Sequence, residues 1–313
     1  MTTGDDGRPA ARPRTDGAAV PPGPVDGAIV DCHVHVFDPG FPFAADRTYT
    51  PGPATVADLR AFLAGLGVAR AVLVQPSVYG DDNACLVAAL AALGPAVARG
   101  IAVIDPATVP DDALTALARA GVVGVRVNLH TRGQDGIQDR GRAAVAAVAE
   151  TIGRVAPLGF AVQLFVDLAL VPALADTIAA APVPVVLDHF AGARAAAGPG
   201  QPGLDVLLDL LAAGRVWIKL SGVYRAGREA PDYPDLAPLA RRLIAANPDR
   251  LVWASDWPHT GGGAERAGRA ATDIEPFRTV DDHRALAVLA EWAGDATTTK
   301  KILVDNPTRL FRF

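Results

Sequence analysis

The stretch VDCHVHVFDP, residues 30–39, joins a short apolar run to a cluster of polar side chains. Seven more runs of this kind follow, rich in Val, Ile and Leu and separated by helix-like patterns. Short, near-continuous apolar runs are typical of parallel strands that helices cover on both faces. The expected strands are Ala28–His35, Ala69–Gln75, Arg99–Ile104, Gly124–Asn128, Ala161–Phe165, Val185–His189, Val216–Leu220 and Leu251–Ser255.

Helical patterns follow these runs, and several end at a glycine, a typical helix stop. Eight strand-then-helix units in 313 residues predict an α/β protein with a (β/α)8 TIM barrel. The alternative is an open doubly wound sheet, but no Gly-rich phosphate loop follows the first strand. A last segment, 305–313, offers Asn306 as a helix cap and Pro307 as the first helical residue. The expected helices before it are 56–67, 85–94, 111–121, 143–159, 171–181, 204–214, 236–247 and 283–294.

Composition limits the class of protein. The net charge of −5 gives no electrostatic reason to expect nucleic acid or an anionic membrane as a partner, and no apolar run is long enough to span a bilayer. The two cysteines suggest no disulfide framework and favour the cytoplasm. Residues 1–27 lack the apolar core of a secretory signal and are predicted to be a disordered N-terminal tail. We expect residues 28–313 to form one barrel domain of unknown oligomeric state.

Polar side chains stand where several of the strands end. In a barrel, catalytic groups lie at the carboxyl ends of the strands. His33 and His35 are two apart, so they should share one face with Asp31. His189 ends the sixth expected strand, and Asp256 follows the eighth. Each alone could be a barrel cap, a hydrogen-bonded buried histidine or a turn former, but together they predict a site of three imidazoles and one carboxylate.

Three arginines lie near the same ends of the strands: Arg126, Arg132 and Arg225. A buried guanidinium needs an anionic partner. The partner could be a carboxylate of the protein, such as Asp31 or Asp188, or a carboxylate of the substrate. The arrangement favours at least one anionic group on a small-molecule substrate.

Other polar residues near these ends have more than one candidate role. Ser77 and Tyr49, in the loops after the second and first strands, could orient a polar substrate or serve loop structure. Lys219 is expected first as an interior ion pair and second as a ligand. The roles of His130 and Tyr79 are left open.

Several motifs together resemble one family. DCHVHVFDP, VQPSVYGDDN, GVRVN, LDHF, KLSGVYR, SDWPH and NPTRLF resemble the amidohydrolase-2 branch of the amidohydrolase superfamily across residues 28–313. Within the branch, the chain is most similar to the 2-pyrone-4,6-dicarboxylate lactonases. Two departures stand out. Arg126 occupies the strand where two-metal members carry a bridging lysine, and FAVQLFVD (160–167) has neither their histidine nor the tyrosine expected of the lactonases.

The resemblance implies a barrel similar to those of the metal-dependent hydrolases. Its expected reaction is the hydrolysis of a lactone that carries carboxylates and comes from aromatic degradation. The expected substrate is 2-pyrone-4,6-dicarboxylate or a close analogue. Asp256 would be the general base, and the three histidines would polarise the carbonyl. A site that requires no cofactor is favoured, and a site with a single zinc ion is the alternative. The residues implied are His33, His35, His189 and Asp256 for catalysis or zinc, and Arg126, Arg132, Arg225, Ser77 and Tyr49 for substrate.

Three other functions stay open at this point. A zinc-dependent, non-oxidative decarboxylase of an aromatic or muconate-type acid would use the same four positions. A sugar lactonase would have less need of three arginines. A non-catalytic barrel would bind an anionic metabolite without needing Asp256 for chemistry.

Overall fold

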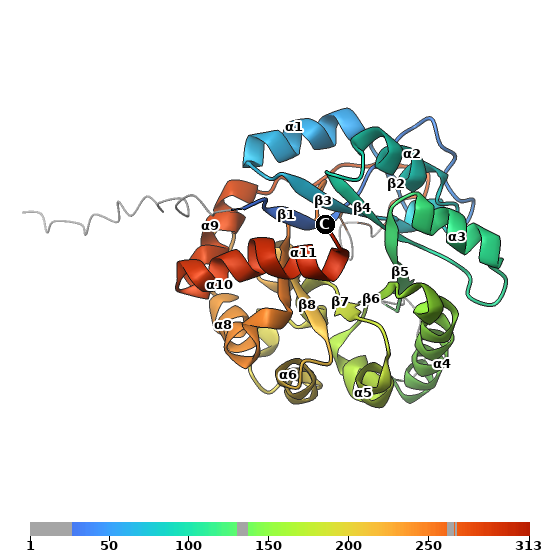
Figure 1. Cartoon of the computed structure of the whole chain (residues 1–313). Helices are drawn as coiled ribbons and strands as arrows, with labels where there is room; N and C mark the ends of the chain where they lie inside the picture. Colours follow the sequence, from blue (N-terminus) through green and yellow to red (C-terminus); the bar gives the residue numbers. More distant parts are fainter. Residues whose placement is uncertain (1–26, 130–136, 262–265, 267) are drawn as a thin grey trace, which may run out of the picture.

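The computed structural model of this chain describes residues 27–129, 137–261, 266 and 268–313. Its centre is a sheet of eight parallel strands in the order β1-β3-β4-β5-β6-β7-β8-β9, which the helices surround (Figure 1). The bounds lie close to those expected from the sequence. The strands are β1 Val30–Val34, β3 Arg70–Val74, β4 Ala98–Ala102, β5 Val122–Asn128, β6 Ala161–Phe165, β7 Val185–Leu187, β8 Trp217–Ser221 and β9 Leu251–Ala254.

The two edge strands of this sheet meet just beyond their carboxyl ends. The amide of His35 donates to the carbonyl of Trp257 at 2.9 Å, and the amide of Asp256 donates to the carbonyl of His33 at 3.1 Å. These bonds close the sheet into a barrel, so the predicted (β/α)8 architecture is confirmed. Three of the four residues that make these bonds, His33, His35 and Asp256, also belong to the polar cluster.

Helices follow the strands as predicted, with boundary differences of a few residues. Thr55 caps the first helix through a capping box with Asp58, and Gly67 ends it in the left-handed conformation. The short α7, Val223–Ala226, was not expected. The others are α1 Val56–Leu66, α2 Ala84–Leu93, α3 Asp111–Arg119, α4 Ile137–Val155, α5 Val171–Ala180, α6 Leu204–Ala212, α8 Ala237–Ala246 and α9 Asp282–Ala293.

The C-terminal segment differs from its prediction. α10, Ala296–Lys300, continues through a π-helical turn into α11, Asn306–Phe311. Asn306 therefore lies inside a continuous helical run, and the prediction that it caps a helix was wrong. Its side-chain amide donates instead to the carbonyls of Pro248 and Leu251, both at 2.8 Å. This pair of bonds ties α11 to the start of β9.

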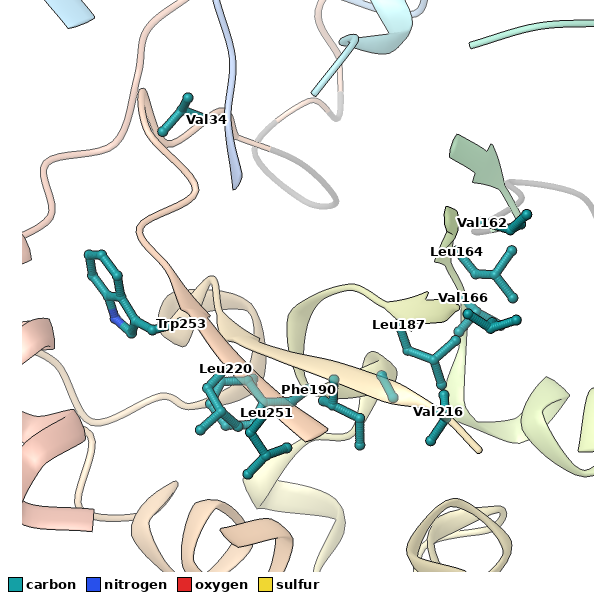
Figure 2. Close-up of a cluster of buried hydrophobic side chains, with 14 of the residues drawn as sticks. Val34, Val162, Leu164, Val166, Leu187, Phe190, Val216, Leu220, Leu251 and Trp253 are labelled. Carbon is teal, nitrogen blue, oxygen red and sulfur yellow. The ribbon is translucent and has the colours of Figure 1, made fainter. Parts of the chain in front are cut away.

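The hydrophobic core has two layers. Figure 2 shows part of the outer layer, in which Val34, Leu164, Leu187 and Trp253 belong to the cluster that includes buried residues of the surrounding helices. The inner layer lies inside the barrel, where α11 crosses one end (Figure 1) and Phe311 joins a cluster of strand residues. Burial of this kind contributes about 25 cal/mol for each Å² of apolar surface.

Two predictions about the rest of the chain have different outcomes. Among the described residues, none of the helices combines the length and apolar character needed to cross a bilayer. Residues 1–26 lie outside the described residues, so the disordered tail stays a prediction, and so does the cytoplasmic location. Cys32 and Cys85 are free and buried.

Candidate active site

The end of β1 contains a β-bulge that the sequence pattern did not reveal. The ladder pairs Asp31 with Ala71 but Val34 with Leu73, so β1 carries one extra residue over this interval. The expectation that Asp31 shares a face with the histidines was therefore wrong. Its carboxyl group instead bonds the hydroxyl and the amide of Ser255, at 2.5 and 3.1 Å. Burial raises the pKa of Asp31 to about 7.

His35 has a defined tautomer. Its Nδ1 lies 2.8 Å from the carbonyl oxygen of Val74. A carbonyl only accepts hydrogen bonds, so Nδ1 carries the proton and Nε2 of the neutral ring presents a lone pair. Burial lowers the pKa of His35 to about 4, which keeps the ring neutral near pH 7. His35 is therefore suited to be a metal ligand or an acceptor, and it does not donate to a carbonyl as the sequence-based mechanism required.

A buried polar network lies behind His33. Its Nδ1 is 3.3 Å from both Asp188 Oδ1 and Lys219 Nζ. Lys219 also donates to Gln163 Oε1 at 2.6 Å, and it lies 3.3 Å from Asp188 Oδ1. Lys219 and Asp188 are fully buried, so the predicted interior ion pair is confirmed. Burial, followed by the charge of Lys219, holds the pKa of His33 well below its usual range.

Two protonation patterns satisfy this network. Nε2 of His33 lies 3.3 Å from Nε2 of His35, which is an acceptor. Without a cation, His33 would donate from Nε2 to His35 and accept at Nδ1 from Lys219. With a cation bound at Nε2, His33 would donate from Nδ1 to Asp188, the usual arrangement behind a metal-bound histidine.

His189 and Asp256 both have strained backbone conformations. Their φ angles are +50° and +68°, in the left-handed region where a non-glycine residue costs roughly 1–3 kcal/mol. His189 follows β7 in a tight turn, and its Nδ1 lies 2.9 Å from Ser221 Oγ. Burial lowers the pKa of His189 to about 4. Strain at these two positions is typical of residues that the surrounding fold holds in place for function.

The two oxygens of Asp256 have different surroundings. Oδ2 accepts hydrogen bonds from the hydroxyl of Tyr224 at 2.6 Å and from Nε of Arg225 at 2.8 Å. Oδ1 is buried and has no hydrogen-bond partner among the described residues. Burial opposes ionisation, but Arg225 holds the pKa of Asp256 well below its usual range. The carboxylate is therefore ionised, with one oxygen free.

Four donor atoms converge at this point. Asp256 Oδ1 lies 3.8 Å from Nε2 of His33 and 3.9 Å from Nε2 of both His35 and His189. Three imidazole nitrogens and one carboxylate oxygen are a normal donor set for zinc. The unpartnered Oδ1 and the lone pair of His35 both face this point, so the residues fit a single divalent cation. The structure thus brings together the four residues that the sequence predicted.

A cavity of about 940 Å³ opens above these atoms. Tyr49 and Ser77, which were predicted to orient the substrate, both line it. Four of the lining arginines were not predicted from the sequence, because no apolar strand pattern directly precedes them. The arginines of the lining are Arg47, Arg126, Arg194, Arg225, Arg266 and Arg278.

The predicted arginines have different surroundings. Arg126 lies over the ring of Phe165, with its Nε 3.5 Å from Asp188 Oδ2, so a protein partner is present. Arg225 donates to Asp256 and also, from Nη2, to Thr260. Arg132 and His130 lie outside the described residues. Tyr79 has a loop role, because its hydroxyl bonds the backbone of Asp38.

A family model described as amidohydrolase (Amidohydro_2) matches residues 30–313. The chain belongs to the amidohydrolase family. The resemblance inferred from the sequence motifs is thereby confirmed. The matched region includes the barrel and all the converging residues.

Named relatives of this amidohydrolase act on lactones. It is 34% identical over 306 residues to a 4-sulfomuconolactone hydrolase of Rhizobium radiobacter, covering 97% of this chain and 94% of that one. It is 34% identical over 293 residues to a 2-pyrone-4,6-dicarboxylate hydrolase of Comamonas testosteroni, covering 90% and 89%. A crystal structure of a probable 2-pyrone-4,6-dicarboxylic acid hydrolase from Acinetobacter baumannii, with citric acid bound, is similar at a TM-score of 0.70 and 26% identity, covering 91% of this chain and 99% of that one.

Proposed function

We propose that this amidohydrolase hydrolyses a lactone that carries anionic groups, such as 2-pyrone-4,6-dicarboxylate or 4-sulfomuconolactone. One observation carries the proposal: the free oxygen of an ionised Asp256 faces three neutral imidazoles on the wall of an arginine-rich cavity. The names of the relatives support the same class of substrate.

Asp256 Oδ1 is the proposed acceptor of a proton from water. Water then adds to the lactone carbonyl, the ring C–O bond breaks, and the proton passes to the leaving ring oxygen. His189 can donate from Nε2 to the carbonyl oxygen, provided that Ser221 donates its hydroxyl proton to Nδ1. His35 cannot share this role while its Nδ1 proton is bound to Val74.

The lone pair on His35 favours the zinc alternative over the metal-free mechanism. His33, His35, His189 and Asp256 would hold the ion. Zinc bound there would polarise the carbonyl and acidify the attacking water. Asp188, which lies 3.3 Å from Lys219, would accept from Nδ1 of His33 and so keep the ring in the tautomer that leaves Nε2 free to bind.

Two assays test the reaction. Protein with a measured zinc content and chelator-treated protein are each given 2-pyrone-4,6-dicarboxylate and 4-sulfomuconolactone, and the ultraviolet band of the ring is followed. We expect loss of the band in the zinc form without release of carbon dioxide, and restoration by zinc of activity lost to the chelator. Carbon dioxide release would support the decarboxylase instead. If neither substrate is turned over in either metal state, the proposal is refuted. If only neutral sugar lactones are turned over, the protein is a sugar lactonase instead.

Arg126 is the proposed anchor for a substrate anion. Arg126→Gln should raise KM for the dianionic substrate by roughly 10–100-fold, because a hydrogen bond to a charged group is worth about 1.5–3 kcal/mol. Arg241→Gln is the matched control, since Arg241 is exposed on α8 and does not line the cavity. Equal KM values for the wild type and Arg126→Gln would remove Arg126 from the binding site.

A further inference from the structure

Tyr224 lies one residue before Arg225 on α7 and was not among the residues predicted from the sequence. We propose that Tyr224 is a positioning residue that turns the carboxylate of Asp256 so that Oδ1, and not Oδ2, is presented to the imidazoles. The proposal rests on the proposed function, in which Oδ1 does the chemistry.

The carboxylate of an aspartate needs a neighbouring group to fix its orientation. The last torsion of an aspartate side chain joins an sp³ to an sp² carbon and has broad, weakly defined minima. Three neutral imidazoles at 3.8–3.9 Å do not hold Oδ1 in place by direct hydrogen bonds. The orientation must therefore be set from the other oxygen, and both donors to Oδ2 are on α7.

The bond from Tyr224 is a strong one. Its hydroxyl lies 2.6 Å from Asp256 Oδ2, a length typical of an O–H donor to a charged oxygen. A phenol ordinarily keeps its proton near neutral pH, so the hydroxyl can donate this bond. The tyrosine is a permanent donor to this oxygen.

The ring of Tyr224 is itself held in place. The guanidinium groups of Arg225 and Arg278 lie over it, with Cζ 5.0 and 4.9 Å from the ring centroid. His259 meets it edge-on with 5.9 Å between the centroids, and Nε2 of His259 lies 2.8 Å from Asp282 Oδ2. The hydroxyl therefore has a fixed direction, which a positioning role requires.

Tyr224 and Arg225 do different things for Asp256. Arg225 supplies positive charge as well as a hydrogen bond, and it is tied to Thr260. Tyr224 supplies a hydrogen bond only. Removing its hydroxyl leaves the charge of the site unchanged, so Tyr224→Phe separates orientation from electrostatics.

The test compares Tyr224→Phe with Tyr79→Phe. Tyr79 is also buried and hydrogen-bonded, but its hydroxyl bonds the backbone of Asp38 and it does not line the cavity. We expect Tyr224→Phe to lower kcat by about 10–100-fold, as removal of groups that orient a catalytic ligand does, with KM changed by less than about threefold. Tyr79→Phe should leave kcat unchanged. Crystal structures of wild type and Tyr224→Phe should show Oδ1 turned away from the imidazoles only in the variant.

The outcomes are distinguishable. An unchanged kcat in Tyr224→Phe would overturn the proposal, and so would a lower kcat with Oδ1 still facing the imidazoles. If the wild type turns over no lactone, the proposed function fails, and the pair of crystal structures alone decides the positioning role. A rotated carboxylate would then support it, and an unrotated one would overturn it.

Discussion

At the amino end of the barrel, Phe311 and Leu310 of α11 pack against Val30 and Trp217 at the starts of strands. At the carboxyl end, the same strands lead to imidazoles and carboxylates that are just as deeply buried. Lys219 marks the boundary, since its Nζ lies 6.0 Å from the ring of Phe311 and 3.3 Å from Asp188. The side chains at the amino end pack against one another. At the carboxyl end, Oδ1 of Asp256 has no hydrogen-bond partner among the described residues. We infer that the first end stabilises the fold and the second is completed by a ligand.

The arginines show the same contrast. At the amino end, Arg99 lies over the ring of Phe313 and Arg250 over the ring of Trp217, each with Cζ 4.8 Å from the centroid. These guanidinium groups are used in packing against aromatic rings. At the carboxyl end, Arg126 also lies over a ring but lines the cavity. Such a position leaves positive charge available to an anionic ligand.

The largest expected effect is on activity at the carboxyl end. Asp256→Asn should lower kcat by about 10²–10⁴-fold, because the neutral amide can neither accept the proton from water nor serve as an anionic ligand of zinc. Stability should fall as well, because the neutral amide no longer pairs with the charge of Arg225. Steady-state kinetics and thermal unfolding measure the two effects. A folded, fully active variant would show that Asp256 is not the base. It would also show that activity does not depend on this carboxylate at the carboxyl end of the barrel.

The next effect is on stability at the amino end. Phe311 is fully buried, so Phe311→Ala should lower the free energy of unfolding by about 3–5 kcal/mol through lost burial and a new cavity. The kcat of the protein that remains folded should be close to that of the wild type. Chemical denaturation gives the stability, with Phe311→Leu as a milder control. A selective loss of kcat with unchanged stability would mean that the two ends are not separate in function.

The smallest effect concerns Asp31, which lies between the two ends. Its pKa is about 7 in the folded protein against a usual 3.8, so the folded state binds more protons between pH 4 and 7. The contribution of Asp31 to stability therefore falls as pH rises through this window. Asp31→Asn stays neutral and can donate to Ser255 Oγ. It should exceed the wild type in stability by roughly 2–4 kcal/mol at pH 8 and match it near pH 4.

Denaturation of the wild type and Asp31→Asn at a series of pH values measures this difference. His35 and His189, with lowered pKa values, contribute the opposite slope in both proteins and cancel in the comparison. A difference that does not change with pH would mean that Asp31 is ionised throughout, and would contradict the assigned shift.

Much of the fold could be predicted because it rests on local pattern. The apolar runs that become β6 and α1 have the periods of a buried strand and of an amphipathic helix, and Gly67 ends α1 as expected. Asn306 shows where local pattern fails. Asparagine before proline is a good cap by propensity, but here two carbonyls near β9 bind its side chain inside a longer helix. Tertiary partners outweigh a local preference of this size.

In the candidate site, too, some features could be predicted from the sequence and others depend on tertiary contacts. The sequence by itself determined where His33, His35, His189 and Asp256 come together, because the parallel strands of a barrel bring their carboxyl ends to one mouth. It could not determine the bulge that separates Asp31 from them, the proton on His35, or the donor role of Tyr224. Each of these depends on a partner distant in the chain: Ser255 for Asp31, Val74 for His35, and Asp256 for Tyr224. Strand period and chain order determine which residues meet at the mouth, but only the packed structure decides which atom of each faces another, because hydrogen bonds depend on distance and direction.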